Sequence, residues 1–103
     1  MKQAKFFIGQ CIHHRLLAYR GVIVDVDAEF RGLGKWRLQQ APGQAYSAEP
    51  WYHILVDNTG NGAYVSECNL VADDSNEPIN HPLLGEFLVA SGAGYRRNVE
   101  QLN

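Results

Sequence analysis

The sequence predicts a small, mainly β domain in which five short strands close into a barrel. Two stretches, 5–27 and 51–57, are rich in β-branched and aromatic residues, and Gly, Pro or Asp bounds the strands within them. Apolar and polar residues alternate over 20–27 and 51–57, which is the period of a strand and not of an amphipathic helix. Asp, Asn and Gly gather at 57–62, where they supply the backbone conformations of a tight turn.

The first two strands are expected over residues 5–14 and 20–27. Gly9 interrupts the first strand and indicates a bulge, because a glycine inside a strand often marks one. In the second strand, Asp25 and Asp27 lie on the face opposite a row of valines and should face water. The core face of that strand is therefore expected to carry Val22, Val24 and Val26.

The third strand is expected over 51–57, directly after Pro50, and alternation assigns to its core face Tyr52, Ile54 and Val56. The turn at 57–62 leads into a fourth strand at about 63–68. A fifth strand near 86–90 is expected to close the barrel, because an open sheet would expose two edges to pairing with other chains.

The connection between the second and third strands, residues 28–49, is long for a compact domain, so we expect a loop or a short helix there. Four apolar residues recur at a roughly helical interval: Phe30, Leu33, Trp36 and Leu38. Gly32 and Gly34 weaken such a helix and Pro42 ends it. Residues 73–78, rich in Asp, Asn and Ser, are expected to form a solvated acidic loop.

The length of 103 residues predicts a single domain over 1–103, of which the last eight residues are expected to be frayed. No stretch has the composition of a signal peptide or of a membrane span, so we expect a cytoplasmic protein without a membrane partner. Cys11 and Cys68 lack the spacing of a metal or redox motif, and in a reducing cytosol they are expected to be buried free thiols.

The net charge of −2 divides unevenly along the chain. Residues 1–40 hold seven Lys or Arg and three acids, whereas residues 41–95 hold seven acids and no Lys or Arg. This balance lacks the strongly basic footprint of a dedicated DNA-binding protein, so charge alone supports only weak, salt-sensitive DNA binding. A basic patch beside an acidic one suits a protein partner or a second copy of the chain equally well.

The candidate binding residues combine cations that can contact phosphates with aromatic and polar groups that can stack or hydrogen-bond. They are Arg15, Arg20, Arg31, Lys35, Trp36, Arg37, Trp51 and His53. DNA binding requires the cations on one face, whereas a protein partner requires an exposed Trp51, Leu55 or Trp36 as apolar anchor. In the alternative interpretation both tryptophans are core residues, the cations are ordinary surface charges and His53 is structural.

The sequence contains no catalytic, metal or cofactor motif. The four histidines lack metal-ligand spacing, and His13 and His14 should point to opposite faces of a strand. Asp25 and Asp27 share a strand face about 7 Å apart, but both are expected in water, whereas a general acid needs an apolar pocket. Phosphate-binding glycine loops and nucleophile motifs are also absent from the sequence. We therefore expect no enzyme activity, no metal and no cofactor.

Five blocks carry a family resemblance through their order and spacing: Phe7-x-Gly9-Gln10 with His14, Tyr19-Arg20-Gly21-Val22-Ile23 with Asp27, Pro50-Trp51-Tyr52-His53-Ile54-Leu55-Val56-Asp57, Tyr64-Val65-x-Glu67-x-Asn69-Leu70, and His81-Pro82-Leu83-Leu84. Together they resemble the hemimethylated-DNA-binding (YccV-like) family, whose bacterial members are known as heat shock protein HspQ. The resemblance covers most of the chain. It implies an SH3-like β-barrel, binding to DNA methylated on one strand, and a role in stress-linked control of protein degradation.

The resemblance thus implies two activities of different classes. One is recognition of hemimethylated DNA, and the other is action as a specificity factor that helps an ATP-dependent protease degrade damaged or regulatory proteins. A passive, oligomeric interaction domain without specific DNA recognition is the alternative. The expected partners are accordingly a hemimethylated duplex, a protease with its substrates, or further copies of the chain.

Overall fold

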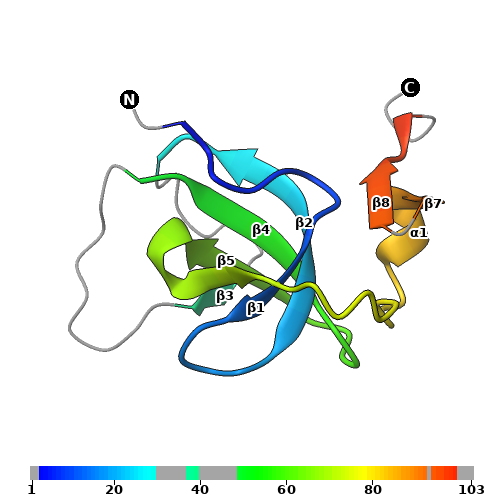
Figure 1. Ribbon diagram of the computed structural model, residues 1–103, viewed down its shortest axis with the longest axis horizontal. Helices are drawn as coiled ribbons and strands as arrows, with labels where there is room; N and C mark the ends of the chain where they lie inside the picture. Colours follow the sequence, from blue (N-terminus) through cyan, green and yellow to red (C-terminus); the bar gives the residue numbers. More distant parts are fainter. Residues whose placement is uncertain (1–2, 30–36, 40–48, 93, 100–103) are drawn as a thin grey trace.

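The computed structural model describes residues 3–29, 37–39, 49–92 and 94–99, and every structural statement below concerns these residues. Its main feature is a curved sheet, and a short helix and a two-stranded hairpin lie to one side of it (Figure 1). The fold is therefore mainly β, as the sequence predicts.

The main sheet has six strands in the order β3-β5-β4-β2-β1-β6. Neighbouring strands are antiparallel except β3 and β5, which run parallel. The strands are β1 (Cys11–His14), β2 (Arg20–Asp27), β3 (Arg37–Gln39), β4 (Trp51–Val56), β5 (Gly62–Ser66) and β6 (Leu70–Ala72). A single turn of 3-10 helix, η1 (Glu67–Asn69), joins β5 to β6.

Closure of the sheet by a strand near 86–90 is a wrong prediction. That strand, β7 (Leu88–Ser91), follows the short helix α1 (Leu84–Phe87) and pairs only with β8 (Gly94–Arg97) in a separate hairpin. The place beside β1 is taken by β6, which the sequence did not predict as a strand. Among the described strands β3 and β6 are the two edges of an open sheet, so the SH3-like barrel stays a prediction.

The middle of β2 is buried on both faces, which differs from the single core face predicted for it. Ile23 packs in the main core, whereas Val22 and Val24 pack on the opposite side in a second cluster. A register irregularity between Ile23 and Asp25 shifts the alternation, and Val26 consequently packs against the main core. The valine row of β2 therefore does not share one face.

The strand β4 is also buried on both faces. Tyr52 and Ile54 lie in the main core as predicted. The hydroxyl of Tyr52 donates to Glu67 Oε2 at 2.6 Å and accepts from the backbone N–H of Phe6 at 3.2 Å. This bridge holds the N-terminal segment against η1 and satisfies a buried N–H that would otherwise be costly.

The first strand begins at Cys11 and not at residue 5. Gly9 has a φ of 92°, and its N–H donates to the carbonyl of Ile23 at 2.7 Å. A Cβ at this position would also collide with the carbonyl of Tyr95 in β8. Gly9 therefore marks a close approach between the N-terminal segment and the C-terminal hairpin, where only glycine fits.

The predicted turn between β4 and β5 is confirmed. Asn58 adopts a φ of 63°, and Thr59 Oγ1 donates to the carbonyl of Val56 at 2.8 Å. The following strand is confirmed as β5, although it ends at Ser66 because η1 begins at the next residue.

Most of the long connection over 28–49 lies outside the described residues, including the greater part of the helix predicted there. Leu38, the last residue of that helical pattern, lies in the strand β3, which pairs with Ala63–Val65 of β5. A parallel partner many residues away in sequence decides this conformation, and local spacing does not reveal it.

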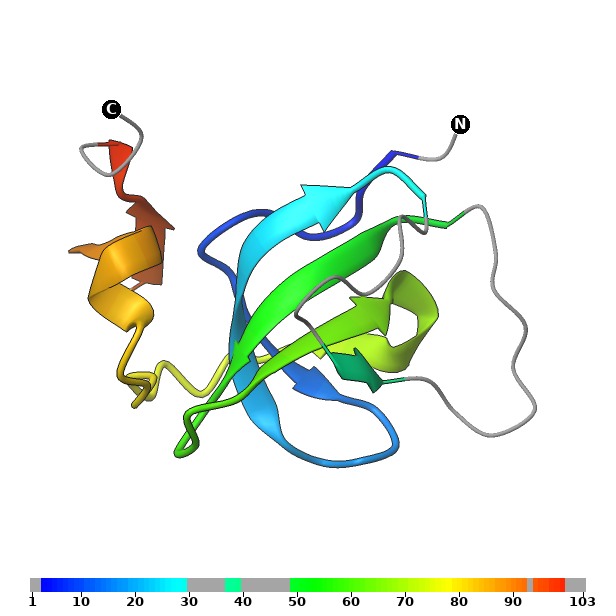
Figure 2. The same ribbon diagram turned by 180° about the vertical axis from the view of Figure 1, so that it is seen from behind.

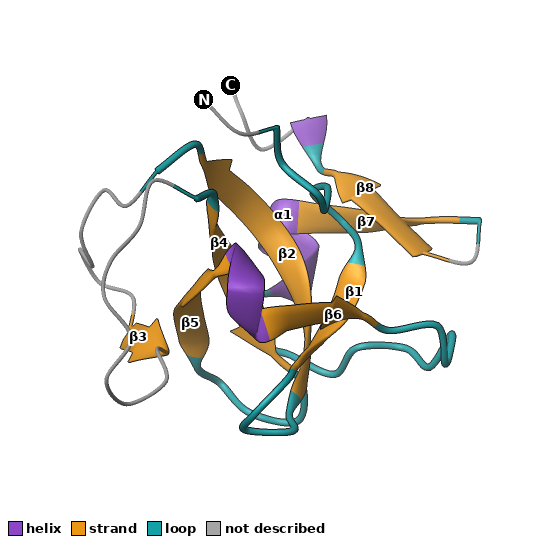
Figure 3. Cartoon of the chain, turned by 60° about the vertical axis from the view of Figure 1, so that its left-hand side comes forward, coloured by secondary structure: helices purple, strands orange, loops and turns teal. Residues whose placement is uncertain are grey.

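The C-terminal hairpin packs against the main sheet through apolar side chains. Leu88 of β7 and Ile79 of the preceding linker complete the second cluster with Val22, Val24 and Leu55. Figure 3 shows β7, β8 and α1 beside β2. Arg96 and Arg97, which fall within the expected frayed tail, belong to β8 and pair with Val89 and Leu88.

Candidate nucleic-acid interface

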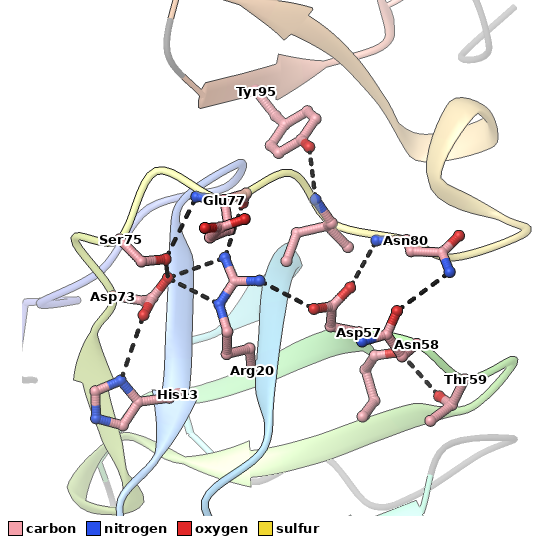
Figure 4. A network of polar contacts seen from close by, with 12 residues as sticks. His13, Arg20, Asp57, Asn58, Thr59, Asp73, Ser75, Glu77, Asn80 and Tyr95 are labelled. Carbon is pink, nitrogen blue, oxygen red and sulfur yellow. Dashed lines mark hydrogen bonds and ion pairs between the residues drawn. The ribbon is translucent and has the colours of Figure 1, made fainter.

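Arg20, at the start of β2, lies at the centre of a polar network (Figure 4). Its Nε donates to Asp73 Oδ2 at 3.0 Å and its Nη1 donates to Asp57 Oδ2 at 2.9 Å. Its Nη2 donates to the backbone carbonyl of Glu77 at 2.8 Å. All three guanidinium nitrogens therefore have acceptors within the protein, and two carboxylates share one cation.

The network ties the linker between β6 and α1 to the sheet. The second oxygen of Asp57, Oδ1, accepts from the backbone N–H of Asn80 at 2.6 Å. The hydroxyl of Tyr95 in β8 accepts from the backbone N–H of Ile79 at 3.0 Å. Charged and neutral contacts thus hold one linker from both sides, which positions Ile79 for the second hydrophobic cluster.

Contacts within the protein fix the orientation of the Asp73 carboxylate. Ser75 Oγ donates to its Oδ2 at 2.8 Å, in addition to Arg20, while its Oδ1 lies 3.8 Å from His13 Nδ1. Partial burial alone would raise the pKa of Asp73, but the bonds from Ser75 and Arg20 and the Arg20 charge outweigh it and lower the pKa below its usual value.

The assignment of Arg20 as a DNA-binding residue stays a prediction, and the contacts of its side chain within the protein speak against it. Burial would lower the pKa of its guanidinium, but its bond to Asp73 and the charges of Asp73 and Asp57 raise it. Only 23 % of the side chain is exposed, and its donors are occupied. A phosphate would have to displace two internal carboxylates, which favours a structural role for Arg20 over DNA binding.

Arg15 lies in a different environment. It occupies the turn between β1 and β2 and is exposed, and no ion pair to its guanidinium is present among the described residues. Its backbone N–H donates to the carbonyl of Asn69 at 2.8 Å, which anchors the base of the turn. Its charge is therefore available to an external anion.

Three of the predicted binding residues, Arg31, Lys35 and Trp36, lie outside the described residues. Arg37 is the first residue of β3, at the edge of the sheet, and only its backbone is described. The expectation that Arg15, Arg20, Lys35 and Arg37 share one face stays a prediction for this reason.

Trp51 and Leu55 are not the exposed apolar anchors expected for a protein partner. Trp51 is 0 % exposed and Leu55 is 1 % exposed, and the indole ring of Trp51 packs on Tyr64 with 5.2 Å between ring centroids. Leu55 is covered by the second cluster, which Leu88 of the hairpin and Ile79 of the linker join, although simple alternation assigns this residue to solvent.

His53 takes part in a local cluster on the sheet. Its Nε2 lies 3.2 Å from Asp27 Oδ2, and the hydroxyl of Tyr64 donates to the same oxygen at 2.7 Å. The His53 and Tyr64 rings stack with their centroids 4.6 Å apart. These contacts join β2, β4 and β5, which supports the structural interpretation of His53 over a role in ligand binding.

Two further cations lie on the C-terminal hairpin. Arg96 and Arg97 of β8 are both exposed, and Arg97 Nη2 lies 3.9 Å from Asp25 Oδ1. At this distance and exposure the pair contributes little to stability. Arg96 and Arg97 are therefore cations that a nucleic acid can reach.

A cavity of about 370 Å³ lies where the hairpin meets the beginning of β1. Its lining includes Phe7, Gln10, Cys11, Asp73 and Tyr95. Burial raises the pKa of the Cys11 thiol, and the opposing charge of Arg20 does not reverse this, so the thiol stays protonated and is a poor nucleophile. The cavity has the volume of a small ligand site, but its one thiol is not activated.

Within the described ranges, no group of three or more His, Cys, Asp or Glu side chains is positioned to hold a metal ion. The described helices are too short and too polar for any of them to cross a membrane.

Leu16 and Leu17 were not predicted as site residues, although both lie beside Arg15 in the turn and are 55 % and 57 % exposed. Two consecutive leucines one residue beyond a strand that ends in His13-His14 are a sequence signal that could have identified them. Leucines are usually buried, so sequence alone assigned them no surface role.

Gly9 and Gly21, which both lie where another backbone approaches closely, belong to the sequence blocks on which the family resemblance rests. Residues 4–93 match the family described as hemimethylated DNA-binding protein YccV like. The match covers nearly all described residues except β8. The chain belongs to the YccV-like family of hemimethylated DNA-binding proteins.

Proposed function

We propose that this chain is a non-catalytic, cytoplasmic regulatory protein that binds DNA methylated on one strand. The observation that carries the proposal is the family match over residues 4–93. Arg15 supports it, because this residue is exposed and no ion pair to its guanidinium is present in the part of the chain that the structure describes. Phosphate contacts need guanidinium groups that the protein has not already neutralised.

The charge distribution supports modest affinity with a marked dependence on salt. The net charge is −2, and Arg20 is occupied by Asp57 and Asp73. The exposed Lys and Arg side chains in the described part of the chain are Lys5, Arg15, Arg96 and Arg97. Each phosphate contact contributes about −0.9 to the slope of log affinity against log salt. Specific recognition must therefore come from contacts to the methylated base in addition to the backbone.

The proposal is tested by fluorescence anisotropy with labelled duplexes of one sequence that are unmodified, methylated on one strand, or methylated on both. One series carries N6-methyladenine and a second carries 5-methylcytosine. We expect the tightest binding to a hemimethylated duplex in one series, between about 50 and 200 mM salt. Equal affinity for all three duplexes in both series would overturn specific recognition.

Two arginine variants test the assignment of the cations. Arg15→Gln should lower the salt slope by about 0.9 and weaken binding to all duplexes alike. Arg20→Gln should leave the salt slope unchanged, because the guanidinium of Arg20 is held by carboxylates of the protein. A lower salt slope for Arg20→Gln and an unchanged slope for Arg15→Gln would show that Arg20, and not Arg15, contacts the DNA.

A second candidate function is that of a specificity factor for an ATP-dependent protease under stress. The favouring observation is Phe7, which is 62 % exposed and lines the cavity where the hairpin meets the beginning of β1. An exposed aromatic side chain can serve as an apolar anchor for a protein partner. We expect faster degradation of a model substrate when the protein is added, and a smaller effect with Phe7→Ala. Unchanged turnover with the wild-type protein would remove this candidate.

Self-association without specific DNA recognition is the remaining alternative. Sedimentation of the 11.5 kDa chain across a range of concentrations tests it. An oligomer together with equal binding to all duplexes would favour this alternative over both activities above.

A further inference from the structure

We propose that the tip of the β1–β2 hairpin is the element that reads the methyl group, with Leu16 and Leu17 contacting the methyl and Arg15 contacting the adjacent phosphate backbone. This inference rests on the proposed DNA-binding function and names the surface and the residues that provide its specificity.

The tip is held in one conformation. His14 is 1 % exposed, and its Nδ1 accepts from the backbone N–H of Leu16 at 3.1 Å and of Leu17 at 2.9 Å. The N–H of Ala18 donates to the carbonyl of His14 at 3.0 Å, and Ala18 adopts a φ of 63°. A buried imidazole therefore organises the turn from inside, and little conformational entropy is lost when the tip binds a partner.

The side chains on this fixed backbone point outward. Leu16 is 55 % exposed and Leu17 is 57 % exposed, and Arg15 beside them is exposed as well. Figures 1 and 2 show the β1–β2 loop projecting past the ends of the strands, away from the β7–β8 hairpin. Single exposed leucines are common, but two consecutive ones on a projecting and rigid turn form a contact surface.

The charge around the tip favours a nucleic acid over a basic protein. Residues 11–20 contain two arginines and no Asp or Glu. The two carboxylates that approach Arg20 at the start of β2, Asp57 and Asp73, are both bonded to it. Arg15 therefore carries, next to the apolar pair, a positive charge to which no described residue forms an ion pair, and this suits a phosphate-lined groove.

The dimensions of DNA agree with this arrangement. The major groove admits a two-stranded β-ribbon, and it is there that adenine N6 and pyrimidine C5 are displayed. Proteins recognise methyl groups in that groove by apolar contacts, as they do with the methyl group of thymine. A duplex methylated on one strand offers the leucines a methyl that unmodified DNA lacks, so the tip accounts for preference over unmodified DNA.

The test compares Leu16→Ala, Leu17→Ala and the double variant with the wild-type protein. The readout is the ratio of affinities for the hemimethylated and the unmodified duplex of one sequence. Burial of one methyl group changes affinity about fourfold, so the double variant should lose at least that factor from the ratio. Its salt slope should equal that of the wild type, because no charge is removed.

Leu83→Ala is the matched control, since Leu83 is 40 % exposed but lies next to α1, far from the β1–β2 turn in sequence. It should leave the ratio of affinities unchanged, and all variants should keep the wild-type urea midpoint.

If the wild-type protein discriminates between the two duplexes and the double variant discriminates equally well, the inference is wrong while the proposed function stands. If the wild-type protein does not discriminate, the proposed function itself fails. Loss of stimulated proteolysis with unchanged DNA selectivity would make the tip a protein contact and would also overturn the inference.

Discussion

Two arginines five positions apart, Arg15 and Arg20, differ in their surroundings. Arg20 is at the start of β2, where the residues after β6 and the β4–β5 turn bring Asp73 and Asp57 to it. Arg15 is in the turn before β2, where its backbone is bonded but no ion pair to its side chain is present among the described residues. A formal charge in the sequence becomes a binding charge only where no internal carboxylate neutralises it.

At the residue scale, the lowered pKa of Asp73 predicts how the stability of the protein responds to acid. Its pKa is lowered in the folded protein, so it contributes stability above its ordinary value of 3.8, and that contribution is lost as pH falls through the lower folded value. We expect the free energy of unfolding, measured in urea, to decline as the solution is acidified below about pH 4.

Asp73→Asn should flatten this acid decline, because the amide does not titrate. Asp74→Asn, at the exposed neighbouring position, should leave the decline as it is in the wild type. An identical acid profile for wild type and Asp73→Asn would show that the Arg20–Asp73 contact contributes nothing to stability.

At the scale of elements, the C-terminal hairpin depends on a glycine far away in sequence. Gly9 combines a φ of 92° with a backbone approach to Tyr95 that leaves no room for a Cβ. Gly92, in the turn of the hairpin itself, has a φ of 59° but no atom within 4 Å of an added Cβ. A substitution at Gly92 therefore tests backbone strain alone, whereas the same substitution at Gly9 tests strain together with steric collision.

Gly9→Ala should therefore destabilise the protein by more than Gly92→Ala. The left-handed backbone costs about 1–2 kcal/mol at either position, and the collision at Gly9 adds to it. Urea denaturation gives the two free energies, and amide exchange should show faster opening of β8 only in Gly9→Ala. Equal costs for the two variants would mean that the hairpin does not pack against the N-terminal segment in solution.

At the scale of the whole molecule, two apolar clusters lie on opposite sides of β2 and β4. The main core lies on one side, and on the other Leu88 and Ile79 bring the hairpin and the linker into contact with the sheet. Because the two central strands are common to both clusters, we expect the sheet and the hairpin to unfold together.

Leu88→Ala tests this coupling. Leu88 is 2 % exposed, and truncation of a buried leucine should lower the free energy of unfolding by about 3 kcal/mol. Fluorescence of the buried Trp51 and far-ultraviolet circular dichroism should report one coincident transition in the wild type and in the variant. Separate transitions would show that the hairpin folds as an independent unit.

The sequence by itself predicted the features that depend on local chemistry. The strands β2, β4 and β5 and the turn after Val56 follow from alternation and from Asn and Gly, whose backbone preferences act over a few residues. Arg15 was among the candidate cations predicted from sequence, and the structure places it exposed in the turn between β1 and β2, while its contact with DNA stays a prediction.

The tertiary structure alone decided which face of each strand is covered and which charges remain available. The second cluster, which Leu88 of the hairpin joins, covers Leu55, and Trp51 is buried beside Tyr64, although alternation assigns Trp51 and Leu55 to solvent. The pairing of β6 with β1 brings Asp73 to Arg20, and a buried His14 presents Leu16 and Leu17 at the surface. Burial and ion pairing are properties of residues brought together from distant positions, so a local pattern does not contain them.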